Sequence, residues 1–171
     1  MLRKSYKTNK SILIISFLFF TISMQSQTKC YKDIETALAN KDCVKCIDLS
    51  KKKLKEIPTD IYEFPNLEKL ILRKNKIKYI SDTLSTLEKL HYLDLSSNYI
   101  DFLPTSLSSL NIDTLIMWDN PIYEFPTEFS KWNLKYLDLR AIQMNKEEQK
   151  NIKTLFPSAK IKMDHPCNCG R

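Results

Sequence analysis

Apolar residues recur along the middle of the chain in one fixed pattern. From Leu90 to Ile100 the sequence follows LxxLxLxxNxI, in which the first, fourth, sixth and eleventh positions are apolar and the ninth is asparagine. Five copies of this pattern begin at Val44, Leu67, Leu90, Ile112 and Leu134. Their spacings are 23, 23, 22 and 22 residues, and a fixed period in this range indicates a solenoid built from stacked repeats.

The alternation inside each copy predicts a short strand. In xLxLx the two apolar side chains point to one side of the strand and the intervening side chains point to the other. One such unit cannot bury its apolar side alone, so neighbouring copies must shield each other. An asparagine amide both donates and accepts hydrogen bonds, so it can satisfy backbone groups where the chain leaves the strand. We therefore expect a structural ladder of Asn75, Asn98 and Asn120.

The second half of each copy keeps an apolar residue that is usually followed by proline. The dipeptides are Ile57-Pro58, Ile80-Ser81, Leu103-Pro104 and Phe125-Pro126. Proline suits a side of the solenoid that is neither helix nor ladder. With these features, residues 44–144 resemble the leucine-rich repeat family. The resemblance implies an α/β, right-handed solenoid with a short parallel sheet on its concave face, and a non-enzymatic protein that binds a protein or peptide there.

The two ends depart from the repeat and predict caps. Lys52 and Ile142 replace the asparagine in the first and last copies, as expected where the neighbour differs. Residues 28–43 should form an N-terminal cap with a short helix over residues 33–39. Residues 145–171 should form a C-terminal cap and a cysteine-containing tail. Asn145 to Glu148 has the form of a capping box that opens a helix, and residues 159–163 alternate like an edge strand.

The first 27 residues have the features of a secretory signal peptide. Four basic residues precede an almost wholly apolar run over residues 12–22, and small and polar residues follow. This run is too short to span a bilayer comfortably, which needs about 20 residues. A retained N-terminal anchor is the alternative. We expect export to the periplasm, the cell surface or the medium, with no transmembrane segment after the signal is removed.

Charge and composition narrow the classes of function. The whole chain carries a formal charge of +7, but residues 1–27 contribute four of its 27 basic residues and none of its 20 acidic residues, which leaves +3 for the remainder. A nucleic-acid partner is therefore not expected. The single glycine, Gly170, excludes glycine-rich phosphate loops and dinucleotide fingerprints. No catalytic constellation stands out from the repeats, and His91 and His165 lie in different regions, so we expect no enzyme activity, cofactor or metal.

The five cysteines fall into two groups that are far apart. The first contains Cys30, Cys43 and Cys46, and the second contains Cys167 and Cys169. Five strands span about 19 Å, whereas a disulfide needs Cα atoms roughly 4.4–6.8 Å apart, so the groups pair only if the tail folds back. In an oxidising compartment we expect Cys30 to pair with Cys43 or Cys46 and to fasten the cap. The spacing of Cys43 and Cys46 is also a weak redox or zinc signal. The last two cysteines are free, joined to each other, or paired between chains that are otherwise monomeric.

The outward strand positions form three columns across the predicted sheet. The columns are Cys46, Lys69, Tyr92, Thr114 and Tyr136, then Asp48, Ile71, Asp94, Ile116 and Asp138, and then Ser50, Arg73, Ser96, Trp118 and Arg140. The twelve members from the second to the fifth repeat are the predicted partner-binding set. Aromatic residues and arginine are enriched at binding hot spots. Asp94 and Asp138 would orient a basic group of the partner.

A second candidate surface is basic. Four lysines, Lys51, Lys52, Lys53 and Lys55, lie one repeat before Arg73, Lys74, Lys76 and Lys78, so both groups should stack along one edge. An anionic glycan or an acidic protein could bind there, as in a cell-surface adhesion or envelope module. A solvated charged edge without a ligand is the alternative interpretation.

Overall fold

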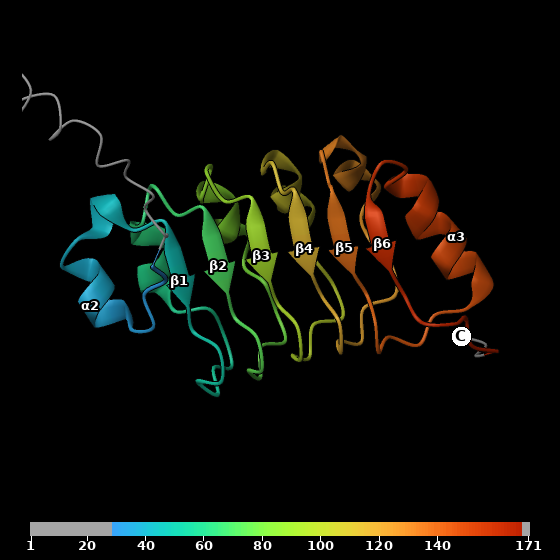
Figure 1. Cartoon of the computed structure of the whole chain (residues 1–171), viewed down its shortest axis with the longest axis horizontal. Coiled ribbons are helices and arrows are strands. Elements are labelled where there is room, and N and C mark those ends of the chain that lie inside the picture. The colour runs from blue at the N-terminus through green and yellow to red at the C-terminus, as the bar shows by residue number, and fades with distance from the viewer. Residues whose placement is uncertain (1–28, 169–171) are drawn as a thin grey trace, which may run out of the picture.

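The computed structural model describes residues 29–168, which form an open sheet of six parallel strands backed by short helices (Figure 1). The strands follow one another in sequence order across the sheet. They are β1 (Cys46–Asp48), β2 (Lys69–Ile71), β3 (Tyr92–Asp94), β4 (Thr114–Ile116), β5 (Tyr136–Asp138) and β6 (Lys160–Lys162). This arrangement confirms the predicted solenoid. The predicted signal peptide, or retained anchor, and Cys169 lie outside the described residues.

The side behind the sheet consists of short 3₁₀-helices rather than the irregular backbone expected from the prolines. They are η2 (Thr59–Glu63), η3 (Asp82–Thr86), η4 (Thr105–Ser109) and η5 (Thr127–Lys131). In three of the four, the residue before the first turn is Pro58, Pro104 or Pro126. Proline lacks an N–H and has a fixed φ, so it fits a position just before a helical turn. Because each helix has five residues, it turns the chain back towards the next strand within one repeat.

The core lies between the sheet and the 3₁₀-helices. The inward strand residues Leu70, Leu93, Leu115 and Leu137 have no exposed surface. The core thus continues from one repeat to the next, as expected for units that cannot fold alone. Near the C-terminal end it becomes aromatic. The rings of Phe129 and Trp132 stack with centroids 4.0 Å apart, and Trp132 and Phe156 extend the stack into the C-terminal cap.

Buried asparagines connect neighbouring repeats where the chain leaves each strand. The Asn98 amide donates to the carbonyl oxygens of Leu72 and Leu95 at 3.0 and 2.8 Å, and its side-chain oxygen accepts from the Ile77 N–H at 3.0 Å. Asn75 and Asn120 make equivalent contacts. Each amide therefore joins its own repeat to the preceding one and supplies partners for buried backbone groups.

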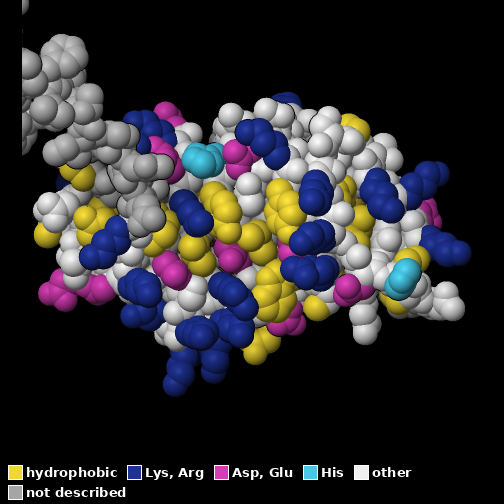
Figure 2. Space-filling model, in the orientation of Figure 1, with side chains coloured by type: hydrophobic (Ala, Val, Ile, Leu, Met, Phe, Trp, Pro, Cys, Tyr) yellow, Lys and Arg dark blue, Asp and Glu magenta, His cyan; other side chains and the backbone are white. Residues whose placement is uncertain are grey.

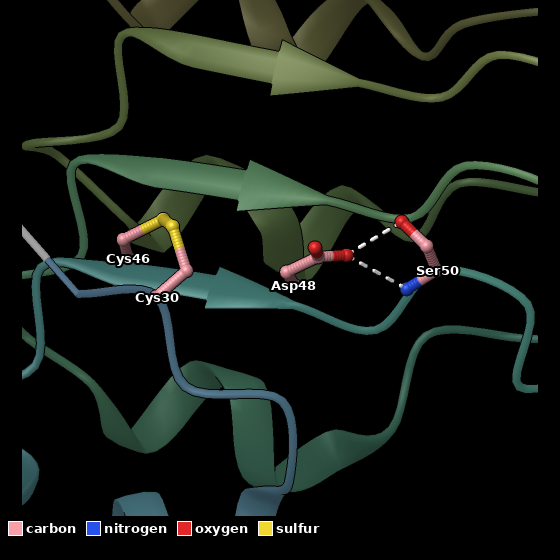
Figure 3. The surroundings of a disulfide bond; sticks show 4 residues. All are labelled: Cys30, Cys46, Asp48 and Ser50. Carbon is pink, nitrogen blue, oxygen red and sulfur yellow. Dashed lines mark hydrogen bonds between the residues drawn. A yellow bond between two sulfur atoms is a disulfide. The ribbon is translucent and has the colours of Figure 1, made fainter.

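The N-terminal cap is fastened to β1 by a disulfide. Helix α2 (Ile34–Leu38) and the 3₁₀-helix η1 (Lys41–Cys43) precede the first strand. Cys30 pairs with Cys46 rather than with Cys43, which is an exposed free thiol, and the Cα atoms of the pair are 4.4 Å apart (Figure 3). Tyr31 then forms a parallel bridge beside β1 by donating to the Cys46 oxygen and accepting from the Asp48 N–H. The sequence pattern did not indicate this bridge.

The C-terminal cap follows the predicted signals. Helix α3 (Lys146–Leu155) begins after Asn145, whose side chain accepts from the Glu148 N–H while the Glu148 carboxylate accepts from the Asn145 N–H. Strand β6 then pairs with β5 in parallel at the edge of the sheet. The tail continues beside the last repeat, where the Cys167 N–H donates to the Met144 oxygen. How Cys167 and Cys169 pair depends on a residue outside the described part.

Candidate functional site

The face of the sheet that points away from the core, here called the strand face, carries the three predicted columns. The register aligns Lys69 with Tyr92, Tyr92 with Thr114 and Thr114 with Tyr136 in the first column. The second column is aligned by the same strand pairs. The third continues beyond the strands, where backbone bonds join successive repeats. Figure 2 shows this face, with hydrophobic side chains over the strands and Lys and Arg side chains among and around them.

Three of the twelve predicted residues are buried. Ser96 has no exposed surface, and Asp94 and Asp138 are 8% and 3% exposed. The other nine reach the surface: Lys69, Ile71, Arg73, Tyr92, Thr114, Ile116, Trp118, Tyr136 and Arg140. Of these nine, Arg73 and Arg140 are the exposed ones and the others are half-buried. The surface offered to a partner is therefore smaller than the pattern predicts, and it is basic and aromatic.

The three carboxylates of the second column bond to residues of their own strand ends. Asp94 accepts from the N–H and the hydroxyl of Ser96 at 3.0 and 2.5 Å, and Asp48 makes the same pair of bonds with Ser50 (Figure 3). Asp138 accepts from Nε and Nη2 of Arg140 at 2.9 and 2.7 Å. These carboxylates support the strand ends, and little of Asp94 or Asp138 is left to orient a partner's basic group.

The contact between Asp138 and Arg140 changes the pKa of both groups. Burial raises the pKa of the Asp138 carboxyl, but the hydrogen bonds and the charge of Arg140 outweigh burial, so this pKa lies below its usual value. The hydrogen bond and charge of Asp138 in turn raise the pKa of the Arg140 guanidinium. Both groups are therefore charged at neutral pH.

Each aromatic ring of the strand face lies next to a cation. Lys69 Nζ is 4.0 Å from the centroid of the Tyr92 ring, and Arg73 Cζ is 5.0 Å from that of Trp118. These distances are typical of cation–π contacts. Arg73 reaches a ring two repeats away because the intervening third-column residue, Ser96, is small and buried. Burial raises the pKa of the Tyr92 hydroxyl, so this group is protonated at neutral pH.

Strand β6 also contributes to this face, which was not predicted from the sequence. Lys162 Nζ lies 5.6 Å from the centroid of the Tyr136 ring. Both lysines of this strand, Lys160 and Lys162, are exposed. The signal was present in the alternation of residues 159–163, which places both lysines on the same side of a strand that continues the sheet.

A second surface lies where the chain leaves the strands. Four aromatic residues, here called the aromatic flank, are unusually exposed: Tyr79 (77%), Tyr99 (56%), Phe102 (55%) and Tyr123 (37%). Tyr79 and Phe102 each stand four positions after a ladder asparagine. This group was not predicted from the sequence either. The signal was an aromatic residue at positions that the repeat pattern leaves outside the core.

The predicted lysine edge includes Lys76 and Lys78, which precede Tyr79 of the aromatic flank in the sequence. Its seven lysines are all exposed: Lys51, Lys52, Lys53, Lys55, Lys74, Lys76 and Lys78. Within residues 29–168 none of them has a carboxylate oxygen within 4.0 Å. These lysines therefore form no direct ion pair within the described part of the chain.

Between residues 29 and 168 there is no group of three or more His, Cys, Asp and Glu side chains arranged to hold a metal ion. In the same range, every helix is too short or too polar to span a bilayer.

Comparison with known proteins agrees with the fold. Residues 44–100 and 65–122 match the family model described as leucine rich repeat. A solved leucine-rich repeat protein of Leptospira interrogans superposes with a TM-score of 0.65 at 28% identity, over 79% of this chain and 37% of that one. An internalin of Listeria monocytogenes superposes with a TM-score of 0.51 at 20% identity, over 64% of this chain and 33% of that one, which shows the fold alone.

The chain thus spans only about a third of the length of these two solved proteins. No curated protein sequence matches it. The repeats, the sequential parallel sheet, the matching family model and the structural neighbours together establish that this chain belongs to the leucine-rich repeat family.

Proposed function

We propose that the protein is a non-enzymatic scaffold that binds a protein or peptide through the strand face, on the concave side of the solenoid. The observation that carries this proposal is the grouping of Tyr92, Trp118 and Tyr136, which reach the surface on adjacent strands although the core does not require them. Strands fixed by the asparagine ladder hold these rings in place. A rigid surface loses little conformational entropy when a partner binds.

Trp118 is expected to contribute most to binding. It is the largest side chain of the strand face, and Arg73 and Ile116 lie beside it. Truncating a central aromatic residue commonly costs about 2 kcal/mol or more of binding energy, which corresponds to roughly a 30-fold loss of affinity.

The test is affinity capture from an extract of the cells that produce the protein. The variant Trp118→Ala/Tyr92→Ala should lose the partner that the unchanged protein retains. The variant Tyr79→Ala/Phe102→Ala is a matched control, because it removes two exposed rings from the aromatic flank and should retain that partner. Equal capture by the unchanged protein and by the strand-face variant would rule out this function.

A second candidate function is the binding of an anionic glycan by the lysine edge, as in an adhesion or envelope module. The supporting observation is that Tyr79, the most exposed ring of the aromatic flank, directly follows Lys78 and lies three residues after Lys76. Both lysines lack carboxylate partners within residues 29–168. Sulfates or carboxylates of a glycan would bind the lysines, while a sugar ring would lie against the tyrosine.

Retention on immobilised heparin tests the glycan proposal. Lys76→Ala/Lys78→Ala and Tyr79→Ala should each elute at lower salt than the unchanged protein. Lys150→Ala/Lys153→Ala removes two exposed lysines from α3 and serves as the control for net charge. If both double variants shift elution equally, the retention reflects total charge and the lysine edge is not a site.

We also propose that the protein is exported. The basic and apolar segments of residues 1–27 and the disulfide between Cys30 and Cys46 support this, because disulfides persist in oxidising compartments. Mass spectrometry of the protein from fractionated cells is the test. A chain that begins near residue 28 outside the cytoplasm is expected, and a cytoplasmic chain that retains Met1 would contradict export.

A further inference from the structure

We propose that the strand face recognises an extended acidic peptide segment of its partner, with carboxylates of that segment beside Arg73 and Arg140 and an apolar side chain between them. This inference rests on the proposed function of the strand face as a protein-binding surface. It adds the chemical class of the ligand and its direction across the strands.

The first support is the surplus of cations on this face. Lys69, Arg73, Lys160 and Lys162 have no carboxylate oxygen within 4.0 Å among residues 29–168. Arg140 is the exception, because it pairs with Asp138 at 2.7 Å, yet half of its side chain is still exposed. Lys69, Arg73 and Lys162 also lie over aromatic rings, so they are held at the surface near apolar groups.

The second support is that the acidic groups of the same face already have partners. Asp94 and Asp138 are buried and bonded to Ser96 and Arg140. The residues that directly precede each strand form a further row across the sheet. In this row Glu68 pairs with Lys45 at 2.8 Å. Asp113 lies 3.4 Å from Lys135 and 3.6 Å from His91 in the same row. A basic partner would find few accessible carboxylates here, whereas an acidic partner would find cations that lack a counter-charge.

The spacing of the cations fits an extended peptide that crosses the strands. Arg73 follows β2 and Arg140 follows β5, so three strand spacings of about 4.8 Å place them roughly 14 Å apart. The distance from β2 to β6 is roughly 19 Å, which an extended segment of about six residues covers at about 3.3 Å per residue. Trp118 lies between the two arginines in the third column.

The apolar groups favour a peptide over a uniformly charged glycan. Ile71 and Ile116 occupy the second column and alternate along it with aspartates. A polymer that carries a charge on every unit would place some of those charges against the isoleucines and lose their hydration without compensation. A peptide that alternates acidic and apolar residues avoids this cost.

The test is selection of a random heptapeptide library, displayed on phage, against the purified full chain. Selected peptides should be enriched at least twofold in Asp and Glu over the starting library and should contain at least one large apolar residue. A synthetic peptide of the selected sequence should bind at least tenfold more weakly to Lys69→Glu/Arg73→Glu. The matched control, Lys76→Glu/Lys78→Glu, reverses the same number of charges on the lysine edge and should bind the peptide with unchanged affinity.

A neutral variant guards against damage to the fold. Lys69→Gln/Arg73→Gln should also weaken binding, by a smaller factor, while its thermal unfolding remains like that of the unchanged protein. If the charge-reversed variant does not fold, the neutral variant decides the question. Unchanged binding by a folded neutral variant would overturn the proposal.

The remaining outcomes separate this inference from the proposed function. Peptides that are not acidic, but that Trp118→Ala/Tyr92→Ala fails to bind, would overturn the acidic class and leave the binding face intact. Peptides that still bind this aromatic variant would count against the strand face itself. If no peptide is selected, or if heparin alone binds and Lys69→Glu/Arg73→Glu abolishes that binding, the acidic-peptide proposal is wrong. The capture experiment then decides the function of the face.

Discussion

Five residues at one repeat position have a left-handed backbone. They directly precede the ninth position of each copy and have φ values of 61° (Lys51), 58° (Lys74), 51° (Ser97), 59° (Asp119) and 56° (Ala141). None of them is glycine, and alanine is especially unsuited because its Cβ clashes while it offers no side-chain hydrogen bond. We predict that Ala141→Gly raises the free energy of unfolding by up to about 1 kcal/mol, measured by urea denaturation.

The same substitution in a right-handed position is the control for this prediction. Ala39, at the end of α2, has φ −61° and is exposed. There glycine only adds freedom to the unfolded chain, so Ala39→Gly should lower stability, by up to about 1 kcal/mol. If both substitutions destabilise the protein equally, the left-handed turns carry no strain that glycine relieves.

The contact between Asp138 and Arg140 makes stability depend on pH. Because the pKa of Asp138 is lowered in the folded state, the contact stabilises the fold above the unfolded value of about 3.9, and this contribution is lost as the pH falls through the folded pKa. We predict that Asp138→Asn costs about 1–3 kcal/mol at pH 7 and less below pH 4. Urea denaturation between pH 2 and pH 7 measures this. Parallel stability curves for the two proteins would contradict the prediction.

The asparagine turns are the elements that join one repeat to the next. Replacing Asn98 by alanine leaves the Ile77 N–H without its side-chain partner. It also removes one of the two asparagine donors of the Leu72 and Leu95 oxygens, which keep their bonds from Asn75 and Asn120. At about 1–3 kcal/mol for the unpaired N–H and about 1 kcal/mol for the donor lost by the two oxygens, we predict a total loss of about 2–4 kcal/mol. Asn145→Ala, which removes only the cap of α3, should cost about 1 kcal/mol. Equal losses in thermal or urea unfolding would mean that the ladder is no stronger than a helix cap.

The sequence predicted those elements that depend on periodic burial. The strands and the C-terminal helix follow from apolar spacing and from the capping residues Asn145 and Glu148, which act locally. The 3₁₀-helices were not predicted, because the same prolines fit any compact turn with a fixed φ. The bridge at Tyr31 was also not predicted, because it depends on where Cys30 is fastened. Spacing alone left open whether Cys43 or Cys46 is its partner.

The candidate site was predicted in position but not in its chemistry. The 22–23-residue period aligns Tyr92, Thr114 and Tyr136 in one column, which the register confirms. Burial was not predictable from that alignment, because long side chains lean over short ones, as Arg73 does over Ser96 towards Trp118. The bonds between Asp138 and Arg140 could have been anticipated, since residues two apart share one face of a strand.

The molecule as a whole is a linear array of repeats, because each strand pairs only with its sequence neighbours. In such an array, stability is approximately a sum of repeat terms and nearest-neighbour interfaces. Ile77 and Ile100 occupy the same buried position in adjacent repeats, whereas Ile47 and Ile122 lie in the first and fourth repeats. Each Ile→Val substitution should lower the free energy of unfolding by about 0.5–1.5 kcal/mol. A protein that carries two such substitutions is expected to remain folded.

We therefore predict that double-mutant cycles depend on the distance between repeats. Ile47→Val and Ile122→Val should add to within about 0.3–0.5 kcal/mol, because three strand spacings of about 4.8 Å separate their repeats. Ile77→Val and Ile100→Val should deviate from additivity by about 0.5 kcal/mol or more, because the two residues share one stretch of core. Urea denaturation of the four single and two double variants measures both cycles. If the distant pair couples as strongly as the adjacent pair, the repeats do not act through nearest neighbours, and a change at one end of the strand face would then be felt at the other.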